Sequence, residues 1–135
     1  MTDAPNKQWK YEDKIHVVTG ATGLYGRELI KRLLALGAQI RTVSRHDLPK
    51  DPLFQTPQIE HLKGDLSELS VANAAMKGAD ALFHLAGQRG SIGIQKTNAA
   101  DMLAGNLLVC FNSLEAARRA SISRILYVST VTVYP

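Results

Sequence analysis

The sequence has few of the features that mark secreted or membrane-spanning proteins. It contains a single cysteine, Cys110, among 135 residues, so no disulfide can form within the chain. Its apolar runs are all much shorter than the roughly 20 residues that a membrane-spanning helix needs. The first dozen residues are polar and lack the apolar core of a signal peptide. These absences favour a soluble, cytoplasmic protein with no membrane partner.

Strong charge and aromatic clusters are also missing. The formal net charge is only +4, and aromatic residues make up 6% of the chain. Nucleic-acid-binding domains instead concentrate basic side chains on one face, so we expect no nucleic-acid partner. The four histidines are scattered over predicted strands and a loop without the spacing of a ligand set. The sequence therefore predicts no metal site.

Apolar segments of two kinds alternate along the chain after a polar lead-in, residues 1–13. Short β-branched or continuous apolar runs predict strands at 15–19, 40–43, 59–63, 81–85 and 125–128. Helical spacing of apolar residues predicts helices at 24–36, 67–77 and 98–119. Three prolines predict that residues 45–57 form a loop. One side of the last helix carries Met102, Leu103, Leu107, Phe111 and Leu114.

This alternation defines the fold class. Strands that alternate with helices form a parallel sheet covered on both faces. We therefore predict that residues 14–135 form one α/β domain, a doubly wound Rossmann fold with strand order 3-2-1-4-5. In such sheets the ligand binds beside the first strand, where the strand order reverses.

Three glycines, Gly20, Gly23 and Gly26, separate the first predicted strand from the first helix. In a dinucleotide-binding loop, the first glycine permits a tight turn and the second lets the backbone approach a pyrophosphate. The third lets the helix pack closely on the sheet, and the helix N-terminus attracts the anion. The alternative is a glycine-rich turn without a ligand. No Gly-Lys-Ser/Thr sequence follows, which excludes a nucleoside-triphosphatase P-loop.

Four motifs in order, at residues 19–26, 64–66, 83–87 and 128–135, resemble the extended short-chain dehydrogenase/reductases. This NAD(P)-dependent epimerase/dehydratase family acts largely on nucleotide sugars. The resemblance runs from Lys14 to Pro135 and covers the N-terminal part of the family pattern. It implies a NAD(P)-binding half of an oxidoreductase or epimerase that moves a hydride to or from a sugar carbon.

Residues 86–92, together with Ala100, Asp101 and Asn106, are similar to the GDP-fucose synthase and GDP-mannose epimerase branch. Ser91 departs from that branch, which usually has a glycine there. This partial match suggests a nucleotide-sugar substrate without naming the sugar.

The resemblance also implies cofactor contacts at matched positions. They are Leu24, Tyr25, Asp65, Leu66, Leu85, Ala86, Gly87 and Asn106. Two of them have alternatives that the sequence leaves open. Asp65 either accepts a hydrogen bond from adenine or begins a capping box with Glu68. Asn106 either lies beside the cofactor or is a polar break in an apolar stripe.

The end of the second strand suggests which cofactor binds. NAD enzymes place a carboxylate there, about 20 residues beyond the glycine loop, to bind the ribose 2′-hydroxyl. Here Ser44 and Arg45 occupy that place, and an arginine would pair with a 2′-phosphate. We therefore predict that NADP is preferred. NAD is the alternative if Asp47 turns back onto the ribose.

Catalysis in the family uses a Ser or Thr that bonds the reacting oxygen and a Tyr-x-x-x-Lys pair for acid/base chemistry. Thr130 matches the Ser/Thr position, whereas none of the four tyrosines belongs to such a pair. We therefore expect this chain to be inactive alone and the activity to belong to a longer parent enzyme. The alternative is a non-catalytic dinucleotide-sensing module that acts on a protein partner. A homodimer is compatible with either interpretation.

Overall fold

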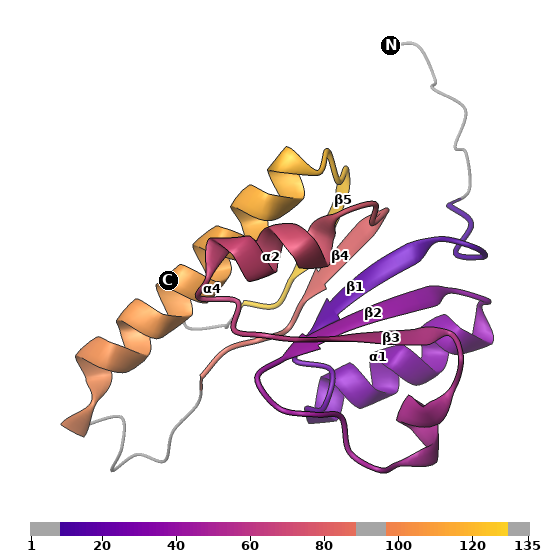
Figure 1. Ribbon diagram of the computed structural model, residues 1–135, viewed down its shortest axis with the longest axis horizontal. Helices are drawn as coiled ribbons and strands as arrows, with labels where there is room; N and C mark the ends of the chain where they lie inside the picture. Colours follow the sequence, from indigo (N-terminus) through magenta and orange to yellow (C-terminus); the bar gives the residue numbers. More distant parts are fainter. Residues whose placement is uncertain (1–8, 89–96, 130–135) are drawn as a thin grey trace.

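The computed structural model describes residues 9–88 and 97–129 and contains a parallel sheet with strand order β3-β2-β1-β4-β5 (Figure 1). The strands are β1 (Ile15–Thr19), β2 (Gln39–Ser44), β3 (Ile59–Lys63), β4 (Ala81–His84) and β5 (Arg124–Tyr127). The helices are α1 (Leu24–Ala35), α2 (Leu69–Met76), α4 (Ala99–Arg119) and the short 3₁₀ helix η1 (Pro52–Gln55). The predicted fold class and strand order are confirmed.

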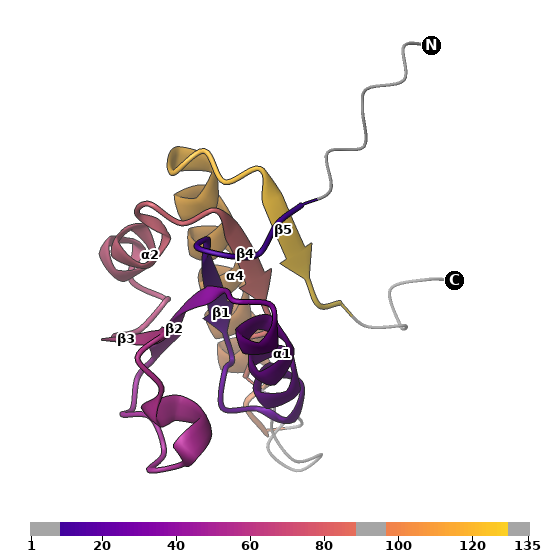
Figure 2. The same cartoon turned by 90° about the vertical axis from the view of Figure 1, so that its right-hand side faces the viewer.

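Helices cover both faces of the sheet (Figure 2). On one face, α1 packs Ile30 against Val18 of β1. On the other face, α2 and α4 pack against Val17 and Leu82. Successive residues of a strand point to opposite faces, so the neighbours Val17 and Val18 belong to two separate cores. Four of the five residues of the central strand β1 are thereby buried, and the strand ends directly at the glycine loop.

Two segments differ from the sequence prediction. The proline-rich loop contains η1, which begins after Asp51 because the Asp51 carboxylate accepts a hydrogen bond from the Leu53 N–H, 2.9 Å. The helix predicted from Ser67 begins instead at Leu69. The residues before Leu69 form a turn that borders the site described below.

The large apolar side chains of α4 face outward. Leu103, Leu107 and Phe111 are 61%, 60% and 68% exposed. The buried face of α4 is made of Asn112, Ser113, Ala116 and Ala117. These smaller side chains let α4 lie close to α2 and the sheet. No helix in the described part of the chain combines the length and the apolarity needed to cross a membrane.

Candidate functional site

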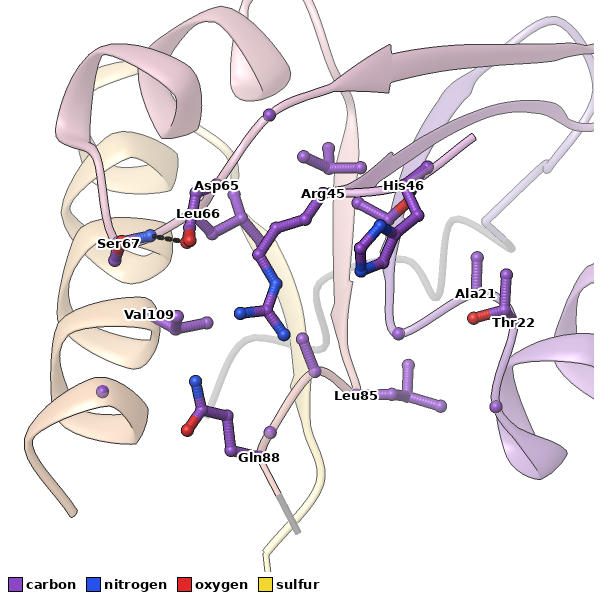
Figure 3. A pocket seen from close by; sticks show the side chains of 18 of the residues that line it. Ala21, Thr22, Arg45, His46, Asp65, Leu66, Ser67, Leu85, Gln88 and Val109 are labelled. Atoms are coloured by element: carbon purple, nitrogen blue, oxygen red, sulfur yellow. Dashed lines mark hydrogen bonds between the residues drawn. The ribbon is translucent and has the colours of Figure 1, made fainter. Parts of the chain in front are cut away.

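A cleft of about 550 Å³ lies at the carboxyl edge of the sheet (Figure 3). The loops after β1, β2, β3 and β4 form its walls together with one side of α4. This is the switch point at which open α/β sheets bind ligands. The structure brings most of the predicted cofactor residues together here, namely Gly20, Gly23, Arg45, Asp65, Leu66, Leu85, Ala86 and Gly87.

The three glycines of the loop are required for different reasons. Gly20 has φ +68°, and a Cβ there would lie 2.8 Å from the Leu85 carbonyl group. At Gly26 a Cβ would lie 2.3 Å from the Gly20 oxygen, so only glycine lets α1 begin this close to the loop. At Gly23 a Cβ would meet only the Gly20 oxygen, at 3.2 Å. The protein itself therefore excludes a side chain at Gly20 and Gly26, whereas a side chain at Gly23 would mainly occupy the cleft.

The N-terminus of α1 is open to an anion. Gly23 is its N-cap and supplies no side-chain cap, and the first turn contains no acidic residue. The first N–H groups of a helix have no partner within the helix, and they carry the positive end of its dipole. Leu24 and Tyr25 begin this helix and are 76% and 74% exposed. Their side chains are thus turned to solvent, and their backbone N–H groups belong to the open N-terminus of α1.

Thr19 joins the glycine loop to the loop after β4, a role that the sequence did not suggest. Its buried Oγ1 accepts hydrogen bonds from the N–H groups of Leu85 and Ala86, each at 3.1 Å. The same oxygen lies 3.1 Å from Nδ1 of His84. One hydroxyl group therefore fixes the position of the glycine loop relative to the loop after β4. The position of a threonine directly before the first glycine was the available signal.

His84 is a buried strand residue whose ring stacks on Tyr127, with 5.4 Å between the ring centroids. Burial lowers the pKa of His84 below its ordinary value, because the charged imidazolium loses its hydration. A neutral His84 accepts the Thr19 hydroxyl proton at Nδ1 while Oγ1 receives the two backbone N–H groups. His84 thus has a structural role beneath the floor of the cleft, through its contacts with Thr19 and Tyr127, as expected for a strand residue.

The turn after β2 presents two basic side chains to the cleft. Figure 3 shows Arg45 and His46 reaching from the end of β2 into the open space. Arg45 is the residue that the sequence predicted for cofactor choice. His46 was not predicted, and its only signal was its position next to Arg45.

The Asp65 carboxylate takes part in the turn before α2. It accepts a hydrogen bond from the N–H of Ser67, 2.8 Å (Figure 3). Hydrogen bonds from Ser67 hold the pKa of Asp65 below its ordinary value, so the group is a carboxylate at neutral pH. This turn, centred on Ser67, replaces the capping box with Glu68 as the local role of Asp65. The predicted contact with adenine stays a prediction.

Two asparagines of α4 fix the loops on either side of the cleft. The Asn106 amide oxygen accepts from the Gln88 N–H at 2.6 Å, and its NH₂ group donates to the Gln88 carbonyl at 3.1 Å. The buried Asn112 donates to the carbonyls of Leu66 at 3.1 Å and Ser67 at 2.7 Å. Asn106 therefore acts on the cleft through the backbone of Gln88. Asn112 was missed because its partners lie far away in sequence.

Two other sequence predictions concern the catalytic residue and metal binding. Thr130, the predicted catalytic residue, lies outside the described residues. Within the described residues, no group of three or more His, Cys, Asp or Glu side chains is placed to hold a metal ion.

The model of the NAD dependent epimerase/dehydratase family matches residues 16–135. The chain belongs to this family. The resemblance stated from the four motifs is thereby confirmed, and with it the NAD-dependent character of the family.

Individual relatives in the family act on different molecules. GDP-mannose 3,5-epimerase 1 of Oryza sativa subsp. japonica is 29% identical over 133 residues, covering 96% of this chain and 34% of that protein. The 3 beta-hydroxysteroid dehydrogenase/Delta 5-->4-isomerase of Mycobacterium tuberculosis (strain ATCC 25618 / H37Rv) is 32% identical over 120 residues, covering 87% of this chain and 32% of that protein. The chain spans about a third of the length of these curated relatives.

Among solved structures, MoeE5 in complex with UDP-glucose and NAD superposes with a TM-score of 0.73 and 28% identity. The match covers 89% of this chain and 38% of that chain. The described fold therefore matches a little more than a third of that solved structure.

Proposed function

We propose that this chain is the cofactor-binding part of an NAD(P)-dependent enzyme that transfers a hydride to or from a carbon of a nucleotide sugar. One observation carries the cofactor assignment. Gly23 lines the cleft, and a Cβ there would have one protein neighbour within 4 Å, the Gly20 oxygen at 3.2 Å, whereas Gly20 and Gly26 are each enclosed by several backbone atoms. The glycine at position 23 is best explained by a ligand that approaches the backbone closely.

The residues of the cleft fit a dinucleotide. The open N-terminus of α1 and the backbone of the Gly20–Gly23 turn would hold the pyrophosphate. The turn containing Asp65 and Leu66 would border the adenine, and residues 85–87 would border the ribose and phosphates. The cleft volume of about 550 Å³ lies within the ordinary range for small-molecule and cofactor sites.

The position of Arg45 at the end of β2 favours NADP over NAD. Arg45 and His46 line the part of the cleft that follows β2, where an NAD enzyme would place a carboxylate. A guanidinium pairs with a phosphate through two parallel hydrogen bonds. Asp47, the alternative ribose ligand, instead forms an ion pair with Lys63 at 3.0 Å. This pairing supports the preference for NADP.

When bound, the nicotinamide would accept or deliver the hydride. This chain's own residues would bind the cofactor, orient it and hold the reacting oxygen of the substrate. Thr130, by its matched position, would hydrogen-bond the reacting oxygen. The nucleotide-sugar substrate is supported by the GDP-mannose epimerase relative and by the UDP-glucose complex of MoeE5. The homodimer, the cytoplasmic location and the inactivity of the isolated chain stay predictions.

Binding of NADP⁺ and NAD⁺ to the 135-residue chain, measured by calorimetry, tests this proposal. We expect saturable binding that Gly23→Leu weakens by roughly a hundredfold, because the pyrophosphate loses several charge-assisted hydrogen bonds. Gly78→Asn is the matched control. It changes a glycine outside the cleft, in the turn after α2, where φ is +70°, no atom lies within 4 Å of the added Cβ, and asparagine adopts this backbone conformation more readily than most residues. Equal affinity of a folded Gly23→Leu chain would contradict the proposal.

A further inference from the structure

The turn that follows β2 is tied to its neighbours at the carbonyl oxygen of His46, in addition to the ion pair between Asp47 and Lys63. This oxygen accepts a hydrogen bond from Ser44 Oγ at 2.5 Å and lies 3.1 Å from Nε2 of His61 on β3. A carbonyl oxygen can only accept, so Nε2 of His61 must carry a proton and donate it. The carbonyl lies between the two side chains that reach into the cleft and the rest of the loop.

The ring of His61 is itself held from its other side. Its Nδ1 lies 2.9 Å from Oγ1 of Thr42, which is completely buried in β2. Thr42 and His61 are partners in the register of β2 and β3. The ring therefore bridges the interior of the sheet and the His46 carbonyl.

This bridge does not depend on the charge of the ring. A neutral His61 accepts the Thr42 hydroxyl proton at Nδ1. A protonated His61 donates from Nδ1, and the hydroxyl then turns its proton to the Glu60 carbonyl, which is 3.4 Å away. In both states the Nε2–H still points at His46. The contribution of His61 is therefore positional.

We infer that His61 is a specificity-determining positioning residue for the cofactor site. It holds the 44–47 turn so that Arg45 and His46 present their side chains to a phosphate on the adenosine 2′-oxygen. This inference rests on the proposed function, because it assumes that the cleft binds a dinucleotide. A turn already fixed in the binding conformation avoids the ordering cost that a free loop would incur on binding.

Two small nucleotides separate binding of the 2′-phosphate from binding of the rest of the adenosine nucleotide. The compound 2′,5′-ADP carries the 2′-phosphate, whereas 5′-AMP lacks it. For the 135-residue chain we expect 2′,5′-ADP to bind more tightly. His61→Leu should lower the ratio of the two affinities by roughly three- to tenfold, the effect of losing one hydrogen bond. The affinity for 5′-AMP should not change.

A second variant excludes the loss of charge as the cause. His61→Gln is neutral but places an amide N–H near the former Nε2 position, so the ratio should return to within about twofold of the wild-type value. Thr42→Val, which frees the ring, should lower the ratio in the same direction as His61→Leu. Circular dichroism melting would verify that each variant is folded.

The possible results separate a failure of the proposed function from a failure of the role of His61. Wild-type protein that binds neither nucleotide would overturn the proposed function itself. Wild-type protein that prefers 2′,5′-ADP, with an unchanged ratio in His61→Leu, would overturn only the role of His61. A parallel loss for both nucleotides, or a Gln variant as impaired as the Leu variant, would also overturn that role.

Discussion

The side-chain amide of Asn112 on α4 donates a hydrogen bond to the Ser67 carbonyl at 2.7 Å, across 45 positions of sequence. On the same helix, the Asn106 side chain forms two hydrogen bonds with the backbone of Gln88. One helix therefore sets the position of two loops that face each other across the cleft. This arrangement explains why α4 keeps polar side chains on its inner face.

Removing the Asn112 amide should loosen the side of the cleft that contains Leu66 and Ser67, where we propose that adenine binds. Asn112→Leu leaves two carbonyl groups without their donor, and we expect a loss of about 1–3 kcal/mol in the free energy of unfolding. The affinity for 5′-AMP should fall as well. Asn98→Leu is the control, because the exposed Asn98 makes no side-chain cap at the start of α4. Denaturant unfolding and calorimetry measure both effects, and equal stability of the two variants would contradict this role.

Reversing the charge at Arg45 should change cofactor preference. Arg45→Asp replaces a phosphate partner with a hydroxyl acceptor, so NADP binding should weaken by roughly ten- to a hundredfold relative to NAD. Arg32→Asp makes the same charge change at the exposed far end of α1. If both variants shift the ratio of affinities equally, the effect is long-range charge and Arg45 does not read the 2′-position.

The buried His84 predicts how stability depends on pH. Its pKa is depressed in the folded protein, so below about pH 6.5 the unfolded chain takes up a proton that the folded chain does not. Stability should therefore fall as the pH drops from about 7 to about 5. His84→Phe should reduce this slope, whereas His46→Phe, at an exposed position, should retain it. Slopes that match the wild type in both variants would contradict the account.

Much of this architecture follows from short-range sequence patterns. The β-branched run before Gly20 and the helical spacing after Leu24 predict β1 and α1, and the alternation of five strands with helices then predicts the strand order of a Rossmann fold. The glycine loop is equally local. The hydrogen bonds of Asn112, Asn106 and His61 were not predictable, because each joins segments that only the tertiary fold brings together.

The outward stripe of α4 shows a second limit of sequence patterns. Periodicity places Leu103, Leu107 and Phe111 on one side of the helix, but it does not say which side meets the sheet. Close packing against α2 selects the small residues Ala116 and Ala117 instead. Amphipathic spacing identifies a helix more reliably than it identifies the buried face.

The isolated chain should not turn over a nucleotide sugar. None of its tyrosines belongs to the Tyr-x-x-x-Lys pair of the family, and general acid/base catalysis typically contributes about 10²–10⁴-fold. We expect no change in NADPH absorbance with GDP- or UDP-sugars under conditions where cofactor binding is saturated. Robust turnover would require another base, and Tyr134 would be the first candidate for substitution.

Mapping the bound cofactor by NMR tests the central claim most directly. Titration of the ¹⁵N-labelled chain with NADP⁺ should move the amide signals of Gly23, Leu24, Arg45 and Asp65 in a saturable manner. The signal of Gly78, in the turn after α2 and outside the cleft, should stay in place. Absence of any shift, or shifts confined to residues outside the cleft, would contradict the assignment of this cleft as the dinucleotide site.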